Sequence, residues 1–234
     1  MKIIACNLKM NLMPSELPNY IEGMKEIKDD VIILPPYIFI SDFIKEGFTT
    51  GSQDIGFKEI GAYTGDVSIL QLKELGIKYS IIGHSERRIY HLDDLLVNNK
   101  IKLCLEHDVM PILCVGETQE ENDRNETLKV CTKELDGALL NNEVKKIIIA
   151  YEPIWSIGTG VVPSNDFIDE VASNIKKYVL NKYGVETLVL YGGSVNDNNI
   201  DKLEQVSSID GYLIGGSSLK PGSMKKIVNC IRGE

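Results

Sequence analysis

The chain has 234 residues, of which 43% are hydrophobic, and its formal net charge at pH 7 is −9. This length and apolar content suffice for one sizeable core. The acidic balance argues against nucleic acid or an acidic membrane surface as a partner. We also expect no membrane association, because no apolar run approaches the ~20 residues that a membrane-spanning helix needs.

Short apolar runs rich in β-branched residues alternate with helical patterns along the whole chain. The apolar runs predict strands at 3–7, 31–34, 49–52, 79–82, 110–115, 146–151, 187–190 and 211–214. The intervening stretches predict helices at roughly 15–28, 38–46, 68–75, 92–106, 124–140, 165–180, 196–203 and 221–231. Strict alternation implies parallel strands joined by right-handed crossovers, and eight such units can close on themselves. We therefore expect an α/β fold, an eight-stranded parallel (β/α)8 barrel.

We expect one domain over residues 1–234, because no linker, low-complexity tract or charge block divides the chain. Ser164 or Asn165 is the expected N-cap of the helix at 165–180, and Gly184 is expected to stop it. Pro221 suits the first turn of the last helix.

The helix expected at 92–106 carries an apolar stripe. Leu92, Leu95, Leu96 and Leu103 recur at helical spacing within an otherwise polar stretch. Such a stripe predicts one apolar helix face packed on the core.

The first residues and the cysteines indicate a cytoplasmic protein. Lys9, Asn11 and Pro14 interrupt the first apolar stretch, so residues 1–15 lack the order of a secretory signal. Five cysteines without a C-x-x-C pair fit a reducing compartment better than a disulfide framework. The three histidines show no metal-binding spacing, so we expect no metal and no cofactor.

One carboxylate, Glu152, follows the apolar run 147–150 almost directly. Behind it, Pro153 and Trp155 restrict the backbone, and the Gly-Thr-Gly segment 158–160 frees it. An acid at the carboxyl end of a buried parallel strand is typical of an α/β active site, and a stiff-then-flexible loop is typical of a lid. Taken alone, Glu152 would be an ordinary helix-capping or solvated acid.

Four further strand ends carry polar or glycine residues, and in a parallel barrel all these ends meet on one face. The residues that we single out there are Asn7, Lys9, His84, Glu86, Ser194, Gly215 and Gly216.

Five motifs in this order resemble the triosephosphate isomerase family, and the resemblance runs from Lys2 to the last helix. The motifs read Asn-x-Lys, Gly-His-Ser-Glu-Arg-Arg, Tyr-Glu-Pro-x-Trp-x-Ile-Gly-Thr-Gly, Tyr-Gly-Gly-Ser-Val and Gly-Gly-Ser-Ser-Leu. The resemblance implies a TIM barrel that interconverts dihydroxyacetone phosphate and D-glyceraldehyde 3-phosphate, in glycolysis and gluconeogenesis. Such an enzyme is an intramolecular aldose-ketose isomerase, and its substrate is a small phosphorylated triose.

The resemblance also implies roles for four residues. Glu152 would be the general base, made more basic by desolvation under a closed lid. His84 would polarise the substrate carbonyl as a neutral imidazole, held so by the N–H groups of a short helix that begins at Ser85; this arrangement is taken from the family. Lys9 would clamp the anionic substrate, and Glu86 would pair with Lys9 or relay a proton.

Substrate binding would rely on backbone groups as well as on charge. Asn7 would orient Lys9 or bond the substrate. The N–H groups of Gly158, Ser194, Gly215 and Gly216 would face the phosphate, since barrels often bind phosphate through their last two strand-following loops. In addition, Tyr191 would hydrogen-bond the closed lid.

Three features depart from the family pattern: Leu8, Val161 with Pro163 soon after it, and a somewhat short chain, chiefly in its helices and connecting loops. Leu8 stands where an aromatic residue is usual, which should affect packing but not chemistry. Val161 replaces a usual lysine and is soon followed by Pro163, which stiffens the end of the lid.

The segment 53–65 is too long for an ordinary strand-to-helix loop and taken alone would be a surface excursion. Its similarity to the family's third loop implies a homodimer, in which this loop docks with Thr64 close to Asn7 and Lys9 of the partner subunit.

Two other readings remain open. The chain could be another phosphate-binding barrel enzyme, such as a ribulose-phosphate epimerase or an indole-forming synthase. The epimerase needs metal-binding histidines and aspartates at its strand ends, which are missing, and a Schiff-base aldolase needs a lysine where Glu152 stands. A catalytically inactive barrel with a binding or structural role is the other alternative. Loss of Glu152, His84 or Lys9 would favour it, and all three are present.

Overall fold

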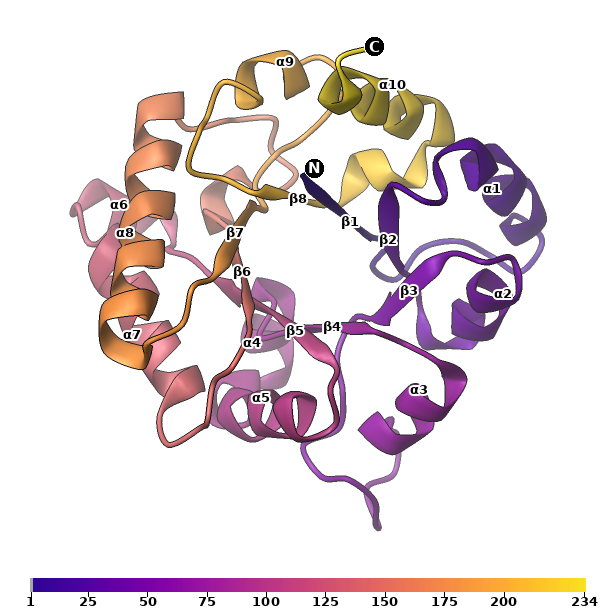
Figure 1. Ribbon diagram of the computed structural model, residues 1–234, viewed down its shortest axis with the longest axis horizontal. Helices are drawn as coiled ribbons and strands as arrows, with labels where there is room; N and C mark the ends of the chain where they lie inside the picture. Colours follow the sequence, from indigo (N-terminus) through magenta and orange to yellow (C-terminus); the bar gives the residue numbers. More distant parts are fainter. Residues whose placement is uncertain (1) are drawn as a thin grey trace.

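The computed structural model describes residues 2–234; Met1, the first residue of the predicted domain, lies outside the described part. Eight parallel strands form a closed barrel in the order β1 to β8, and helices surround it as an outer ring (Figure 1). Pairing of β1 with β8 closes the barrel, with Ile4 opposite Tyr212. The predicted (β/α)8 TIM barrel is therefore confirmed.

The strands agree closely with the prediction. Their bounds are β1 Ile3–Asn7, β2 Val31–Leu34, β3 Thr49–Ser52, β4 Tyr79–Ile82, β5 Met110–Val115, β6 Ile148–Tyr151, β7 Leu188–Tyr191 and β8 Gly211–Ile214. Six of the predicted ranges match these bounds, whereas β6 begins two residues late and β7 lies one residue further on.

Side chains of each strand alternate between two cores, because successive residues of a strand point to opposite faces. In β6, Ile148 and Ala150 belong to an apolar cluster made almost entirely of strand residues, which fills the barrel interior. Ile149 and Tyr151 belong to the larger cluster between strands and helices. Burial on both faces explains the continuous apolar runs in the sequence.

The helices are more divided than the sequence predicts. The α-helices are α1 Leu17–Met24, α2 Ile40–Lys45, α3 Ile69–Leu75, α4 Ser85–His91, α5 Val97–Glu106, α6 Gln119–Asp123, α7 Thr127–Leu139, α8 Asn165–Tyr183, α9 Ile200–Leu203 and α10 Pro221–Arg232. Single 3-10 turns are η1 Lys25–Ile27, η2 Tyr37–Phe39, η3 Asp93–Leu95, η4 Ile154–Ser156 and η5 Gly216–Leu219. The helix α6 is not among those predicted, and α4 is the short helix expected to begin at Ser85.

The predicted start of the helix at 92–106 is wrong. Leu92 adopts a left-handed conformation that ends α4, and Leu95 lies in the turn η3, so α5 begins only at Val97. Leu92 and Leu95 are 76% and 87% exposed and form no part of a core-facing stripe. The reason is Asp93, whose buried carboxylate binds Lys100 and turns the chain at that point.

The helix predicted at 196–203 is also largely wrong, because only its last turn forms. Asparagine side chains bond the backbone instead: the Asn196 N–H donates to Asn199 Oδ1, and the Asn198 N–H donates to Asn196 Oδ1. The end signals of α8 are correct, since Ser164 accepts the Phe167 N–H and Gly184 follows at φ 71°.

Candidate active site

A cavity of about 1040 Å³ opens at the carboxyl ends of the strands. Eight of the nine site residues predicted from the sequence line it: Asn7, Lys9, His84, Glu152, Gly158, Ser194, Gly215 and Gly216. The ninth, Glu86, reaches the cavity only through its contact with Lys9. The parallel barrel thus brings together residues that are spread over more than 200 positions of the chain.

The centre of the site is a carboxylate beside an imidazole. Oε1 of Glu152 lies 3.3 Å from Nε2 of His84, and both side chains are about 95% buried. Within residues 2–234, Oε2 of Glu152 accepts no hydrogen bond. A buried carboxylate with one free oxygen is costly to leave unpaired, and it is suited to accept a proton.

His84 is oriented by the helix that it begins. Its ring is the N-cap of α4, and Nδ1 accepts the backbone N–H of Glu86 at 3.2 Å. A ring nitrogen that accepts an N–H carries no proton itself, so in the neutral ring the proton sits on Nε2. Nε2 is the nitrogen that faces Glu152 and the cavity. The short helix predicted to begin at Ser85 is therefore present.

Lys9 is held by contacts from three strand ends. Its backbone has φ 51°, its N–H donates to Asn7 Oδ1 at 3.0 Å, and its carbonyl accepts from Gln53. Its Nζ lies 2.5 Å from Glu86 Oε1. The ammonium is thus fixed near the floor of the cavity, beside Gly215. Gln53 is a positioning residue that the sequence reading missed.

The predicted lid, residues 153–160, is anchored at Ser156, and residues 158–160 are exposed. Ser156 Oγ donates to the Val161 carbonyl at 2.6 Å, lies 3.2 Å from the Tyr191 hydroxyl, and accepts the Ser194 N–H at 3.2 Å. The Ser194 N–H, predicted to face the phosphate, is therefore engaged with the lid here. Gly158, at φ 70°, is exposed.

Glu117 holds the start of the predicted lid through Trp155, and the sequence analysis did not identify it. This fully buried carboxylate accepts hydrogen bonds from Trp155 Nε1 at 2.9 Å and from the Tyr151 hydroxyl at 3.2 Å. Burial raises its pKa, against these hydrogen bonds, which lower it. Its signal in the sequence was an acid shortly after the fifth strand, parallel to Glu152 after the sixth.

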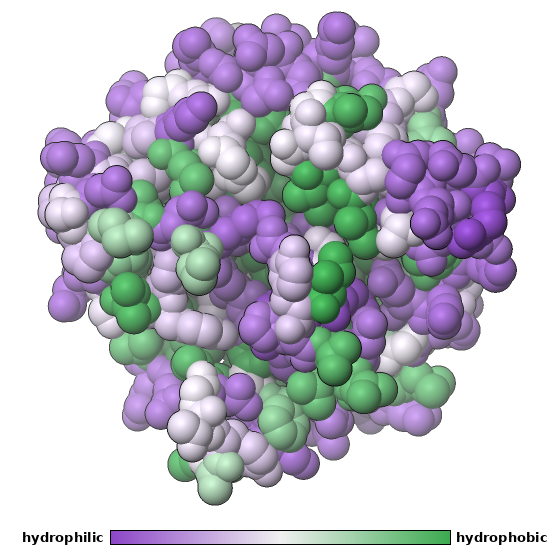
Figure 2. Space-filling model, turned by 180° about the vertical axis from the view of Figure 1, so that it is seen from behind, coloured by the Kyte–Doolittle hydropathy of each residue, from purple (hydrophilic) through white to green (hydrophobic). Residues whose placement is uncertain are grey.

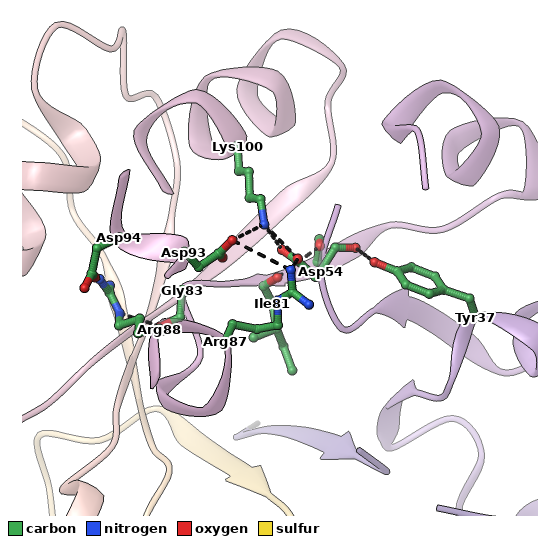
Figure 3. Close-up of polar contacts among 10 residues, drawn as sticks. Tyr37, Asp54, Ile81, Gly83, Arg87, Arg88, Asp93, Asp94 and Lys100 are labelled. Carbon is green, nitrogen blue, oxygen red and sulfur yellow. Dashed lines mark hydrogen bonds and ion pairs between the residues drawn. The ribbon is translucent and has the colours of Figure 1, made fainter. Parts of the chain in front are cut away.

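A buried ionic cluster includes Asp54 of the loop 53–65 (Figure 3). Lys100 Nζ contacts Asp54 at 2.7 Å and Asp93 at 2.6 Å, and Arg87 lies 2.9 Å from Asp54. The Asp54 carbonyl accepts the Tyr37 hydroxyl. The cluster joins the loops that follow β2, β3 and β4, and no periodic pattern in the sequence announces it.

Two properties of residues 2–234 bear on other kinds of function. No group of three metal-ligating side chains is placed to hold an ion. No helix in this part of the chain combines the length and apolar content that crossing a membrane requires.

Comparison with known proteins gives a consistent result. The family model of triosephosphate isomerase matches residues 2–231. The triosephosphate isomerase of Clostridium tetani is 42% identical over 243 aligned positions, which cover 97% of this chain and 95% of the relative. That of Thermoanaerobacter pseudethanolicus is 40% identical over 243 aligned positions, covering 97% and 98%. The Prochlorococcus marinus (strain NATL1A) relative is 39% identical over 242 positions, covering 97% of each.

Proposed function

Because this chain belongs to the triosephosphate isomerase family, an isomerase family, we propose that it interconverts dihydroxyacetone phosphate and D-glyceraldehyde 3-phosphate. The observation that supports this most is the pair formed by Glu152 and the Nε2 of His84, 3.3 Å apart, at the floor of the cavity. We propose that the reaction belongs to glycolysis and gluconeogenesis.

Glu152 is the proposed general base. Its carboxylate takes the proton from the carbon next to the substrate carbonyl, and the electron pair moves into an enediolate. The same carboxylic acid returns the proton to the neighbouring carbon, which completes the isomerisation without a cofactor. Its position supports this role: the side chain is buried beside His84, and within residues 2–234 its Oε2 accepts no hydrogen bond.

His84 is the proposed electrophile. Its Nε2–H donates to the carbonyl oxygen as negative charge develops there, and then moves protons between the two oxygens of the enediolate. The Nδ1 hydrogen bond from the Glu86 N–H supports this role, because it leaves the donor on the cavity side.

Lys9 is the proposed anion clamp, with Glu86 holding its ammonium and Asn7 its backbone. For the phosphate, we propose the N–H groups of Gly158, Ser194, Gly215 and Gly216. For Ser194, this requires that its bond to Ser156 be exchanged when the lid closes. The exposed Gly158 supports such a closure, since its free conformation lets the loop fold over the cavity.

We further propose a homodimer formed through the loop 53–65, which projects beyond the helix ring (Figure 1). Its tip is ordered by the contact of Phe57 with Tyr63, whose ring centroids lie 4.9 Å apart. Figure 2 shows hydrophobic residues gathered on the lower part of the face that points away from the viewer in Figure 1. Large exposed apolar residues follow each of the neighbouring strands β1 to β4: Met10, Met13, Ile38, Ile60, Tyr63, Tyr90, Leu92 and Leu95. Exposed apolar surface of this extent marks an interface.

The free state of all five cysteines supports the proposed cytoplasmic location. We also propose that the whole chain forms one domain and that the reaction uses no metal.

A coupled assay tests the proposed reaction. The purified chain is given D-glyceraldehyde 3-phosphate, and dihydroxyacetone phosphate is measured through its reduction by a coupling dehydrogenase. We expect turnover without added metal and unchanged by a chelator. Absence of turnover in the folded protein would favour the catalytically inactive barrel.

A further inference from the structure

Another carboxylate, that of the largely covered Glu134 on α7, lies behind the catalytic floor rather than in it. Its Oε2 accepts the backbone N–H of Gly116 at 2.8 Å, and its Oε1 lies 3.6 Å from Arg88 Nε. Its side chain is 18% exposed. Nothing in the reaction proposed above uses this residue.

Gly116 is pressed against the backbone of the proposed base. A Cβ placed on Gly116 would lie 1.9 Å from the Glu152 carbonyl oxygen, so no side chain fits there. The neighbouring residues bind the same segment: the Glu152 N–H donates to the Val115 carbonyl at 2.8 Å, and the Ile154 N–H donates to the Glu117 carbonyl at 3.0 Å. The backbone at 115–117 is therefore the support on which Glu152 rests.

Arg88 extends this support to His84. Its Nε donates to the carbonyl of Gly83, the residue before His84, at 2.7 Å, and an Nη donates to the Cys114 carbonyl at 3.0 Å. Asp94 contacts its other Nη, and Figure 3 shows Arg88 between Asp94 and Gly83. One guanidinium thus fixes the ends of β4 and β5, which carry and support the two catalytic side chains.

We propose that Glu134 and Arg88 form a positioning pair that sets the distance between Glu152 and His84. Glu134 holds Gly116 by its hydrogen bond and Arg88 by its charge, and the two backbones that they fix carry the base and the electrophile. This inference depends on the isomerase activity proposed above. It concerns residues that touch no substrate and act through their neighbours.

The charge of Glu134 is poised to respond to pH. Burial raises the pKa of Glu134 to about 7, against Arg88 and the Gly116 N–H, which lower it. Above that pH the carboxylate attracts Arg88; below it, the neutral carboxyl loses this attraction. The titratable or charged groups around Glu134 are Arg88, Asp94, Cys114, Glu121, Glu126, Lys129, Cys131, Lys133 and Glu152.

The test compares two substitutions of Glu134 with a control on the same helix. Glu134→Ala removes both contacts, and we expect kcat to fall on the order of tenfold with KM nearly unchanged, since a small misplacement of the base slows chemistry but not phosphate binding. Glu134→Gln keeps an oxygen for the Gly116 N–H and should recover kcat to within about threefold of wild type. Asp136→Asn, which alters contacts to Tyr178 and Tyr183 on α8, should leave kcat unchanged.

The pH profile gives a second readout, which a purely structural role would not move. The ratio of wild-type kcat to Glu134→Gln kcat should fall from about three at pH 8 to about one at pH 6, as Glu134 takes up a proton. If Glu134→Ala does not fold, the pH dependence of this kcat ratio is sufficient to test the proposal. A constant ratio, a wild-type kcat in folded Glu134→Ala, or an equal loss in Asp136→Asn would each overturn the proposal. Inactive wild-type protein would instead refute the isomerase activity itself.

Discussion

At the scale of single residues, the proposed chemistry rests on side chains held by their own backbone surroundings. His84 is oriented by a helix that begins at its own ring, and Lys9 by an asparagine two residues earlier. Both arrangements use a few neighbouring positions, which is why short motifs were enough to find these residues. Glu134, Gln53 and Glu117 were missed because their partners lie far away in the sequence.

Substitutions of His84 and Lys9 should separate the two proposed roles. His84→Gln should lower kcat by roughly 10²-fold with little change in phosphoglycolate affinity, because the imidazole faces the carbonyl and not the phosphate. Lys9→Ala should weaken phosphoglycolate binding, because it removes positive charge from the anion's site. Calorimetric titration with phosphoglycolate measures the inhibitor affinity of both variants, and the coupled assay measures kcat. Equal losses of inhibitor affinity in the two variants would contradict this division of roles.

Lys100 offers a prediction about stability. Lys100→Met keeps the length of the side chain but removes the buried cation between Asp54 and Asp93, and only Arg87 remains beside them. We expect the free energy of unfolding to fall by about 3–5 kcal/mol, as when one partner of a buried ion pair is removed. Urea denaturation measures the loss. The control is Lys102→Met on the same helix, where the ion pair with Glu106 is exposed and should contribute at most about 1 kcal/mol. Similar losses in the two variants would show that the buried cluster is not held by its charges.

At the scale of elements, the strands were predicted better than the helices. A strand buried on both faces needs a continuous apolar run, and such runs have sharp ends in this sequence. Helix ends instead depended on side-chain contacts that the local pattern does not contain. Asp93 is the clearest case. It lies in the turn η3 and its carboxylate binds Lys100, and the helix begins only at Val97 rather than at Leu92.

The lid can be tested as one element. An enediolate phosphate exposed to water can expel its phosphate, so the lid must both hold the phosphate and exclude solvent. Deleting residues 157–159 should lower isomerisation by about 10²-fold or more and raise the fraction of turnovers that release inorganic phosphate and methylglyoxal. Glu152 and His84 remain to start the reaction. Phosphate release per turnover is the measurement, and a slower variant without extra phosphate would refute the lid.

At the scale of the whole molecule, closure of the barrel makes the site. Eight parallel strands put all their carboxyl ends on one face, so Asn7 and Gly216 meet there despite their distance in the sequence. The alternation of strands and helices was sufficient to predict this architecture. What alternation could not predict is the ionic cluster that ties the loop 53–65 to the barrel.

The proposed dimer predicts a change of mass. Wild-type protein should sediment at about twice the chain mass of 26.1 kDa. Ile60→Asp, at the exposed tip of the loop, should shift it towards the monomer, because a charge buried in an apolar interface is costly. Leu180→Asp is the matched control, since Leu180 is exposed on α8, which follows β6 rather than β1 to β4. Monomeric wild-type protein would contradict the proposal.

The most direct test of the account is proton exchange at the substrate carbon in Glu152→Gln. This variant keeps the size of the side chain and removes its basicity. Incubated with dihydroxyacetone phosphate in deuterated water and followed by proton NMR, wild-type protein should form D-glyceraldehyde 3-phosphate and replace one carbon-bound hydrogen with deuterium. Glu152→Gln should do both roughly 10²–10⁴-fold more slowly, with an unchanged circular dichroism spectrum. Exchange near the wild-type rate in the folded variant would show that Glu152 is not the base.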